Sequence, residues 1–243
     1  MDLLSRIFVF IILLFLSTSC IRKSGKKNIY TQSSEISNSN LSSRKSDKAE
    51  VPLLPKSNSK MTGSEIFEKY NSAVFMVFTS DGIKGYQGSG FFISPTGIAV
   101  SNYHVFEGTT VGYEQIKLSD NRIYKIKNVI VKSKEDDFII FEVESLGVNF
   151  NYIPIGKNQP KVGETVFAIG SPRGLENTFS SGEISQLRDN NQIQINVPID
   201  HGSSGGALIN EYGHVIGITT SGLDYSGANL NFAVNINVLK PFL

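Results

Sequence analysis

The sequence predicts an all-β domain built as two six-stranded antiparallel barrels, with short helices at its two ends. Short apolar runs recur from residue 73 onward, and Gly, Asn, Asp and Ser separate them. The 22 glycines suit many tight turns. Many short strands with turn signals between them are typical of sandwiches and barrels. Roughly 180 residues with about a dozen strands fit two six-stranded barrels.

The expected strands form two groups along a folded domain that spans residues 62–243. The first barrel, about residues 73–150, would use the runs Ala73–Phe78, Gly90–Ile93, Gly97–Val100, Ile123–Val131 and Phe138–Val143. The second barrel, about residues 151–236, would use the runs Thr165–Ile169, Thr178–Ile184, Gln192–Val197, Ala207–Ile209, Val215–Thr220 and Leu230–Val234.

A short helix is expected before the first strand. Thr62 and Glu65 have the spacing of a capping box, in which the two side chains cap the helix N-terminus reciprocally. Ile66, Phe67 and Tyr70 then recur at helical spacing. Ordered structure should therefore begin near Thr62.

The first 20 residues predict a secretory signal peptide with a lipoprotein processing site. Arg6 precedes the apolar run Ile7–Leu16, which is shorter than the about 20 residues of a membrane-spanning helix. Small residues and then Cys20 follow, and this resembles the site where bacterial lipoproteins are cleaved and lipidated. Ordinary signal-peptide cleavage and an uncleaved anchor are the alternatives. All three place the domain outside the cytoplasm.

Residues 21–61 predict a disordered linker. They are rich in Ser, Asn and Lys and lack an apolar period, so they cannot bury enough surface to offset the entropy of ordering. They hold nine Lys and Arg against three Asp and Glu, whereas residues 62–243 hold thirteen against eighteen. The linker could favour an anionic membrane surface. The folded part has no basic stripe, so nucleic acid is not an expected partner.

The segment Gly202–Gly206 carries the densest chemical signal and makes Ser204 the candidate nucleophile. A serine hydroxyl needs a base to take its proton, and the attacked carbonyl needs hydrogen-bond donors for its developing charge. A glycine-rich turn exposes the side chain and lets successive backbone N–H groups converge. The same composition also fits an ordinary turn, so this segment alone does not decide the function.

The chain has three histidines that could serve as the base. His104 follows the strand that ends at Val100 and enters a loop, where it could face a cleft between the barrels. His201 lies three residues before Ser204, which suits the wall of the loop better than a base. His214 lies in what reads as an exposed hairpin turn. We therefore rank His104 first, His201 second and His214 last.

A carboxylate should orient the imidazole and stabilise its charged form. Asp137 opens the apolar strand Phe138–Val143, and a carboxylate at the mouth of a buried strand is costly unless it has a partner. Glu135 and Asp136 directly precede it. Asp137 is the candidate, and Asp136 is the alternative.

In the order His104, Asp137 and Ser204, these residues resemble the trypsin-like serine proteases of the chymotrypsin fold. Over about residues 66–243, the surrounding motifs are similar to the HtrA/DegP branch of that superfamily. The motifs are Gly88–Ile93, Ser101–Val105, Asp137–Val143, Gly170–Leu175, Ser181–Ser185, Gly202–Asn210, Gly217–Thr220 and Leu230–Asn235.

The resemblance implies a role for each of these residues. Ser204 would be the nucleophile, His104 the general base and Asp137 its orienting partner. The backbone N–H groups of Gly202, Ser203 and Ser204 would form the oxyanion hole. Thr220 falls where relatives often have a hydroxyl near the aspartate. Neither a cofactor nor a metal is expected.

The primary specificity pocket is expected around Pro198, Thr220 and Ser221. Pro198 lies six residues before Ser204, where a pocket base would stand. Because no Asp stands there, we expect no preference for Lys or Arg. A small to medium aliphatic side chain agrees with the HtrA/DegP branch.

The sequence departs from that branch in three places. Ser203 stands where Asn or Asp is usual, and His201 stands where proline is common. Both lie in the expected oxyanion loop and could tune or weaken activity. The sequence also stops at Leu243, so the PDZ domain typical of the branch is not expected.

The sequence therefore predicts a serine endopeptidase that cleaves proteins in the cell envelope or outside the cell through an acyl-enzyme intermediate. The alternative is a catalytically silent, protease-like lipoprotein that binds or adheres. Expected partners are protein or peptide substrates and a membrane, through a lipid on Cys20. A homotrimer is also a candidate, because HtrA-like proteins often trimerise through their N-terminal segment. Ile66, Phe67 and Tyr70 could form that contact or pack on their own barrel.

Overall fold

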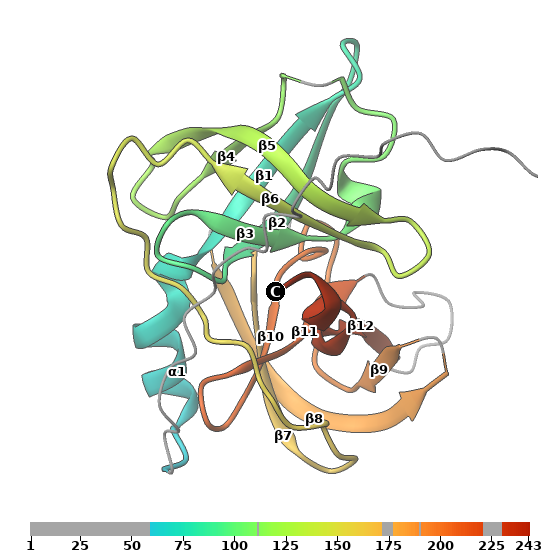
Figure 1. Ribbon diagram of the computed structural model, residues 1–243. Coiled ribbons are helices and arrows are strands. Elements are labelled where there is room, and N and C mark those ends of the chain that lie inside the picture. The colour runs from blue at the N-terminus through green and yellow to red at the C-terminus, as the bar shows by residue number, and fades with distance from the viewer. Residues whose placement is uncertain (1–58, 111, 172–176, 190, 221–229) are drawn as a thin grey trace, which may run out of the picture. The chain divides into compact units, whose positions relative to one another are not determined.

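The computed structural model describes residues 59–110, 112–171, 177–189, 191–220 and 230–243 (Figure 1). The expected signal peptide with Cys20, and the expected linker up to residue 58, lie outside the described residues. The described chain forms two closed barrels of six antiparallel strands each, which confirms the predicted fold class.

The first barrel has the strand order β1-β2-β3-β6-β5-β4. Its strands are β1 (Val74–Ser80), β2 (Gly85–Phe92), β3 (Ile98–Ser101), β4 (Gln115–Lys117), β5 (Ile123–Ser133) and β6 (Phe138–Val143). The sequence analysis missed β4. This strand has only three residues and buries only Ile116, so no apolar period marks it.

The second barrel has the strand order β10-β11-β12-β9-β8-β7. Its strands are β7 (Thr165–Gly170), β8 (Thr178–Arg188), β9 (Gln192–Ile195), β10 (Ala207–Asn210), β11 (Val215–Thr220) and β12 (Asn231–Asn235). Strand β8 runs four residues beyond the expected end at Ile184. Those four residues are exposed, and the extension is held by pairing with β9 and not by burial.

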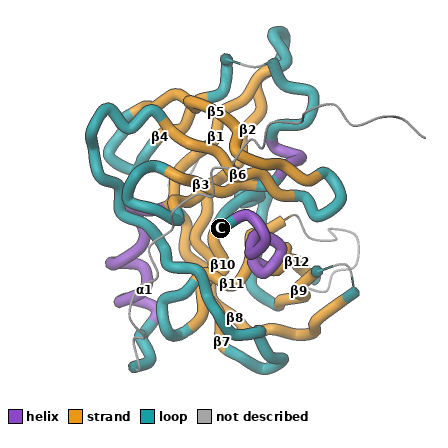
Figure 2. Tube along the Cα trace, in the orientation of Figure 1, coloured by secondary structure: helices purple, strands orange, loops and turns teal. Residues whose placement is uncertain are grey.

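Helices are short and lie mainly at the ends of the described chain (Figure 2). The helix α1 (Gly63–Tyr70) precedes β1, and the described residues also form the 3₁₀ helices η2 (Asn71–Ala73), η3 (Tyr103–Val105) and η5 (Ile236–Phe242). None of the helices in the described part of the chain has the length and hydrophobicity needed to span a bilayer.

The predicted capping box begins α1. The Glu65 N–H donates to the Thr62 hydroxyl (3.3 Å), and the Thr62 N–H donates to the Glu65 carboxylate (2.7 Å). Ile66 and Tyr70 are buried, and the ring of Phe67 meets Phe179 edge-on with 5.8 Å between centroids. The apolar residues of α1 therefore pack on their own domain.

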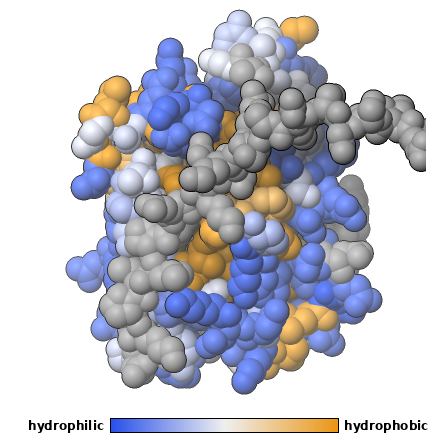
Figure 3. All heavy atoms as spheres, in the orientation of Figure 1, coloured by the Kyte–Doolittle hydropathy of each residue, from blue (hydrophilic) through white to orange (hydrophobic). Residues whose placement is uncertain are grey.

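The core has three parts with different composition. The interior of the first barrel is rich in aromatic rings, and Phe92 stacks on Phe150 with 4.2 Å between centroids. The interior of the second barrel is aliphatic, with Ile184, Ile195 and Leu208 among its members. A third cluster contains side chains from both barrels and from the terminal helices. Hydrophilic side chains cover most of the described surface on the face drawn in Figure 3.

Candidate active site

The pairing of β3 with β6 brings His104 and Asp137 to the same end of the first barrel. Ser101, the last residue of β3, pairs with Ile139, the second residue of β6. Because the two strands are antiparallel, the residues that follow β3 meet the residue that precedes β6. His104 lies in η3, three residues after Ser101, and Asp137 directly precedes β6.

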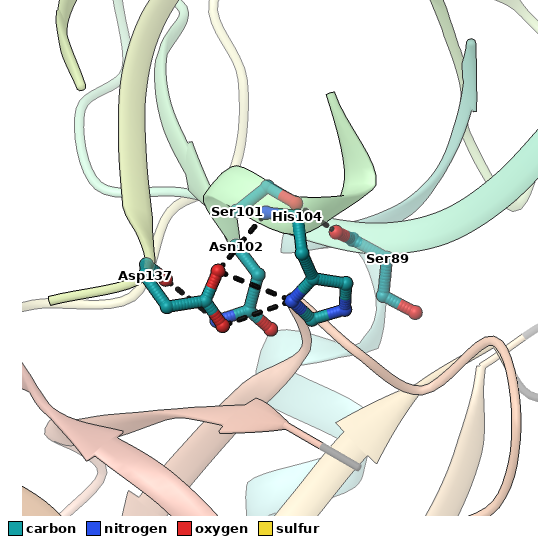
Figure 4. Close-up of polar contacts among 5 residues, drawn as sticks. All are labelled: Ser89, Ser101, Asn102, His104 and Asp137. Carbon is teal, nitrogen blue, oxygen red and sulfur yellow. Dashed lines mark hydrogen bonds and ion pairs between the residues drawn. The ribbon is translucent and has the colours of Figure 1, made fainter. Parts of the chain in front are cut away.

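The Asp137 carboxylate contacts His104 in two ways (Figure 4). Its oxygens lie 3.1 and 2.9 Å from Nδ1 of the imidazole, and Oδ1 also accepts the backbone N–H of His104 at 2.9 Å. A carboxylate can only accept, so Nδ1 carries the hydrogen of this bond. In a neutral imidazole, Nε2 then keeps a free lone pair, which is what a general base needs.

Asp137 adopts an unusual backbone conformation. Its φ is +50°, in the left-handed region that few residues other than Gly, Asn and Asp adopt. The amide Nδ2 of Asn102 donates to the Asp137 carbonyl at 2.9 Å and helps to hold this conformation. Asn102 is fully buried, and its Oδ1 has no hydrogen-bond partner in the described structure.

The alternative carboxylate, Asp136, makes different contacts. Its backbone N–H donates to the Ser133 hydroxyl at 3.1 Å. One carboxylate oxygen accepts from the Asn191 amide of the second barrel at 3.1 Å. Asp136 therefore lies in a turn and an inter-barrel contact, and the carboxylate that meets the imidazole belongs to Asp137.

Ser204 lies between β9 and β10 of the second barrel, against the first barrel. A Cβ atom added to Gly88 would lie 2.7 Å from the methyl carbons of Val105 and 3.2 Å from the Ser204 carbonyl oxygen. Gly88 therefore lies between Ser204 and Val105, the residue that follows His104, and has no side chain to keep them apart. Among the described contacts, no hydrogen bond joins the Ser204 hydroxyl to His104.

The backbone before Ser204 forms a type II turn. The Ser203 N–H donates to the Asp200 carbonyl at 3.0 Å, and Gly202 has a φ of +93°. Positive φ at the third position defines this turn type and favours glycine there. Because the Ser203 N–H is bonded within the turn, it is not free to bind an oxyanion. The N–H groups of Gly202 and Ser204 have no acceptor within the described chain.

The other two histidines have different surroundings. His201 is exposed, and its N–H donates to the Asp200 carboxylate at 2.7 Å. His214 is partly buried and not fully exposed as the sequence suggested. Burial lowers the pKa of His214, and the nearby charges of Lys69 and Lys157 lower it further.

The expected pocket residues are only partly described. Pro198 is exposed, and its carbonyl accepts from the Ser180 hydroxyl at 2.9 Å. Thr220 ends β11, where it pairs with Phe232, and no described contact joins it to Asp137. Ser221 lies outside the described residues. The described residues contain no group of side chains that could hold a metal ion.

Sequence reasoning missed three polar residues that contact the loop carrying Ser204 or contact Asp137. These residues are Ser89, Asn102 and Thr219. Ser89 and Asn102 stand inside the motifs that resemble the HtrA/DegP branch, so a polar residue in a buried strand or beside the histidine was a usable signal. Thr219 stands inside the motif Gly217–Thr220, but a threonine near the end of a strand is common and did not mark it as a contact of the loop.

The family comparison decides where this chain belongs. Residues 88–218, more than half of the chain, match the model of the trypsin-like peptidase domain. The chain belongs to the trypsin-like peptidase family. Membership fits the two six-stranded barrels and the position of the site where they meet.

Individual relatives within this family belong to the HtrA/DegP type, as the sequence motifs predicted. "Protease Do-like 5, chloroplastic" of Arabidopsis thaliana is 31% identical over 62% of this chain and 53% of its own length. "Probable periplasmic serine endoprotease DegP-like" of Rickettsia prowazekii is 33% identical over 82% of this chain and 41% of its own length. The chain thus spans about half or less of the length of these curated relatives.

A solved structure supports the fold. The crystal structure of the serine endoprotease from Yersinia pestis aligns with a TM-score of 0.66 and 24% sequence identity. The alignment covers 76% of this chain and 66% of the other. This likeness agrees with the chymotrypsin-like arrangement of two barrels.

Proposed function

We propose that this protein is an HtrA/DegP-type serine endopeptidase in which Ser204, His104 and Asp137 form the catalytic triad. The observation that carries the proposal is the hydrogen-bonded pair of Asp137 and His104 Nδ1, at 2.9 Å. It stands beside a serine on a tight turn whose neighbouring N–H groups lack an acceptor in the described chain. Family membership supports the reaction class, and the geometry supports the assignment of residues.

In the proposed reaction, the Ser204 Oγ attacks the carbonyl carbon of a peptide bond, and its proton passes to Nε2 of His104. The N–H groups of Gly202 and Ser204 would bind the negative oxygen of the tetrahedral intermediate. Breaking the C–N bond gives an acyl-enzyme, and the His104 proton passes to the leaving amine. A water molecule, deprotonated by His104, then releases the acyl group.

Asp137 would act by orienting the imidazole and stabilising its charged form. Its carboxylate is placed for this by two contacts with His104, one to the ring and one to the backbone N–H. The side chains of His104 and Asp137 are 41% and 28% exposed. This partial exposure would allow His104 to reach a substrate while Asp137 stays beneath it.

The proposal is tested with a fluorophosphonate probe, which labels an activated serine covalently, on the purified full-length chain. Wild type should be labelled and should cleave an unfolded casein, and Ser204→Ala should do neither. Ser94→Ala is the matched control, because it removes a buried hydroxyl in the turn between β2 and β3. Labelling that survives Ser204→Ala would refute the nucleophile. A wild type that is never labelled would favour the silent binding module.

We also propose that the enzyme acts outside the cytoplasm as a lipoprotein anchored at Cys20. The support is the apolar run and the small residues before Cys20. In addition, the Rickettsia relative is named as a probable periplasmic endoprotease. Cys20→Ala should move the protein from the membrane fraction to the soluble fraction of the cell envelope. Retention of Cys20→Ala in the membrane would argue for an uncleaved anchor.

For the assembly, we propose a homotrimer as the state to test first, by light scattering of the purified protein. Ile66 and Tyr70 are buried within their own domain. A trimer would therefore need contacts from other residues than these two. A monomer at micromolar concentration would refute the trimer.

A further inference from the structure

The nucleophile loop consists of Gly202, Ser203 and Ser204, and the carbonyl of each residue accepts a hydrogen bond. The Gly202 carbonyl accepts from the Ser89 hydroxyl at 2.7 Å, and the Ser204 carbonyl accepts from the Ser89 backbone N–H at 2.7 Å. Between them, the Ser203 carbonyl accepts from the Thr219 hydroxyl at 2.7 Å and from the Gly206 N–H at 2.9 Å. Two side-chain hydroxyls, one from each barrel, thus reach consecutive peptide units.

In a planar trans peptide, the C=O and N–H of one unit point in opposite directions. A hydrogen bond that fixes the carbonyl therefore also fixes the direction of the N–H. The Ser203 carbonyl shares its peptide unit with the Ser204 N–H. When Thr219 fixes this carbonyl on the β11 side, the Ser204 N–H must point away from β11. That N–H is one of the two that have no acceptor in the described chain.

Ser89 acts on the neighbouring unit in the same way. The Gly202 carbonyl shares its unit with the Ser203 N–H, which donates to Asp200 and closes the type II turn. The unit is therefore held at both ends. The type II turn also sets the direction of the Gly202 N–H, because this N–H belongs to the central peptide of the turn, between His201 and Gly202.

The Ser89 hydroxyl has no freedom to rotate away. Ser89 is fully buried, and its hydroxyl accepts the Ser171 N–H at 2.9 Å while it donates to Gly202. The Ser89 carbonyl accepts from the buried Ser101 hydroxyl at 2.7 Å (Figure 4). Thr219 is 1% exposed. Because both roles of the buried Ser89 hydroxyl are filled, it has one orientation, which makes it suitable for fixing a backbone.

We propose that Ser89 and Thr219 are positioning residues that hold the Gly202–Ser204 backbone in its anion-binding form. Neither hydroxyl touches the substrate in this role. The inference rests on the proposed function, since it assigns these residues to the oxyanion site of that reaction. It also explains how residues from both barrels can maintain one loop.

The first test compares Ser89→Ala and Thr219→Val with wild type by steady-state kinetics on a peptide substrate. Direct removal of one oxyanion donor costs about 10²–10³ in kcat. Loss of a positioning group should cost less, so we expect kcat to fall about 10- to 100-fold in Ser89→Ala and about 10-fold in Thr219→Val, with KM changed less than about 2-fold. Ser89→Ala should cost more because it leaves both the Gly202 carbonyl and the Ser171 N–H unpaired.

Two variants separate positioning from general destabilisation. Thr219→Ser keeps the hydroxyl and should restore most of the kcat lost in Thr219→Val. Ser94→Ala removes a fully buried hydroxyl that bonds to Thr96, at the opposite end of β3 from His104, and should leave kcat unchanged. An equal fall of kcat in Ser94→Ala would overturn the proposal.

The second measurement does not depend on activity. Hydrogen exchange, read by mass spectrometry on peptides that cover residues 200–207, should be faster in Ser89→Ala and Thr219→Val than in Ser94→Ala. Unchanged exchange in both variants would overturn the proposal. A further outcome is a wild type without protease activity, while Ser89→Ala and Thr219→Val still exchange faster than Ser94→Ala. That result would uphold the positioning role of the two hydroxyls and refute the proposed function.

Discussion

The two barrels contribute to the site in different ways. The first barrel supplies side chains, His104 and Asp137, whose segment is anchored by packing as well as by the Asn102 hydrogen bond to the Asp137 carbonyl. The ring of Phe106, two residues after His104, lies 5.5 Å from that of Phe141 in the aromatic core. The second barrel supplies a backbone loop around Ser204 that is anchored by hydrogen bonds, over an aliphatic core. The side-chain half of the site thus relies on aromatic packing in addition to hydrogen bonds, whereas the loop around Ser204 relies on hydrogen bonds.

The largest effect is expected where the side-chain half is broken. Asp137→Asn should lower kcat about 10⁴-fold, because an amide cannot hold the imidazole in the required tautomer and charge state. The backbone should tolerate the change, since Asn also adopts the left-handed conformation found at residue 137.

The matched control is Asp136→Asn, one residue away. Asp136 contacts Ser133 and Asn191 and not His104, so its loss removes no contact to the imidazole, and kcat should change less than about 2-fold. The measurement is steady-state hydrolysis of a peptide substrate. The reverse ranking of the two variants would show that Asp136 is the orienting carboxylate.

Phe141→Ala tests the packing that supports the histidine segment. Phe141 is fully buried and lies against the rings of Phe75 and Phe106. Its removal should lower the free energy of unfolding by about 3–5 kcal/mol, measured by urea denaturation. Ile83→Ala is the control, because Ile83 is 92% exposed and should change stability by less than about 0.5 kcal/mol. A small loss in Phe141→Ala would mean that the first barrel does not depend on its aromatic core.

Thr62→Ala tests the helix that packs beside the second barrel. The Thr62 hydroxyl accepts the N–H of Glu65, and the hydrogen bonds from Thr62 lower the pKa of the Glu65 carboxyl. Loss of the cap should lower the free energy of unfolding by about 1 kcal/mol. Ser64→Ala, at an exposed position of the first turn, is the control for altered helix propensity. Equal stability of the two variants in denaturant titrations would argue against the cap.

The smallest expected effect is the contribution of His214, in the second barrel, to the pH dependence of stability. Burial lowers the pKa of His214 below its ordinary value of 6.5. The unfolded chain therefore binds this proton more readily, so the stabilising contribution is present above about pH 6.5 and is lost as the pH falls below it. His214→Gln should flatten the fall of the melting temperature between about pH 7 and 5. An identical pH profile in wild type and variant would contradict this.

Some parts of the site and the fold could be predicted from the sequence, and others could not. His104 and Asp137 could be nominated because polar residues at the ends of apolar strands are conspicuous. The strand β4 could not be predicted, since a three-residue strand with one buried side chain has no period to detect. The contacts of Ser89 could not be predicted, because its partners Ser171, Gly202 and Ser204 lie more than 80 positions away along the chain.

The sequence by itself determined the two-barrel fold class and named the candidates for the catalytic residues. Apolar alternation and turn residues are local properties, and so are the identities of Ser204 and the three histidines. Only the tertiary structure decided that His104 contacts Asp137 and not Asp136, because both carboxylates have nearly the same local sequence. It also decided that the N–H of Ser203 is bonded while those of Gly202 and Ser204 lack an acceptor in the described chain. The direction of a backbone N–H depends on hydrogen bonds between distant strands, and no local pattern records them.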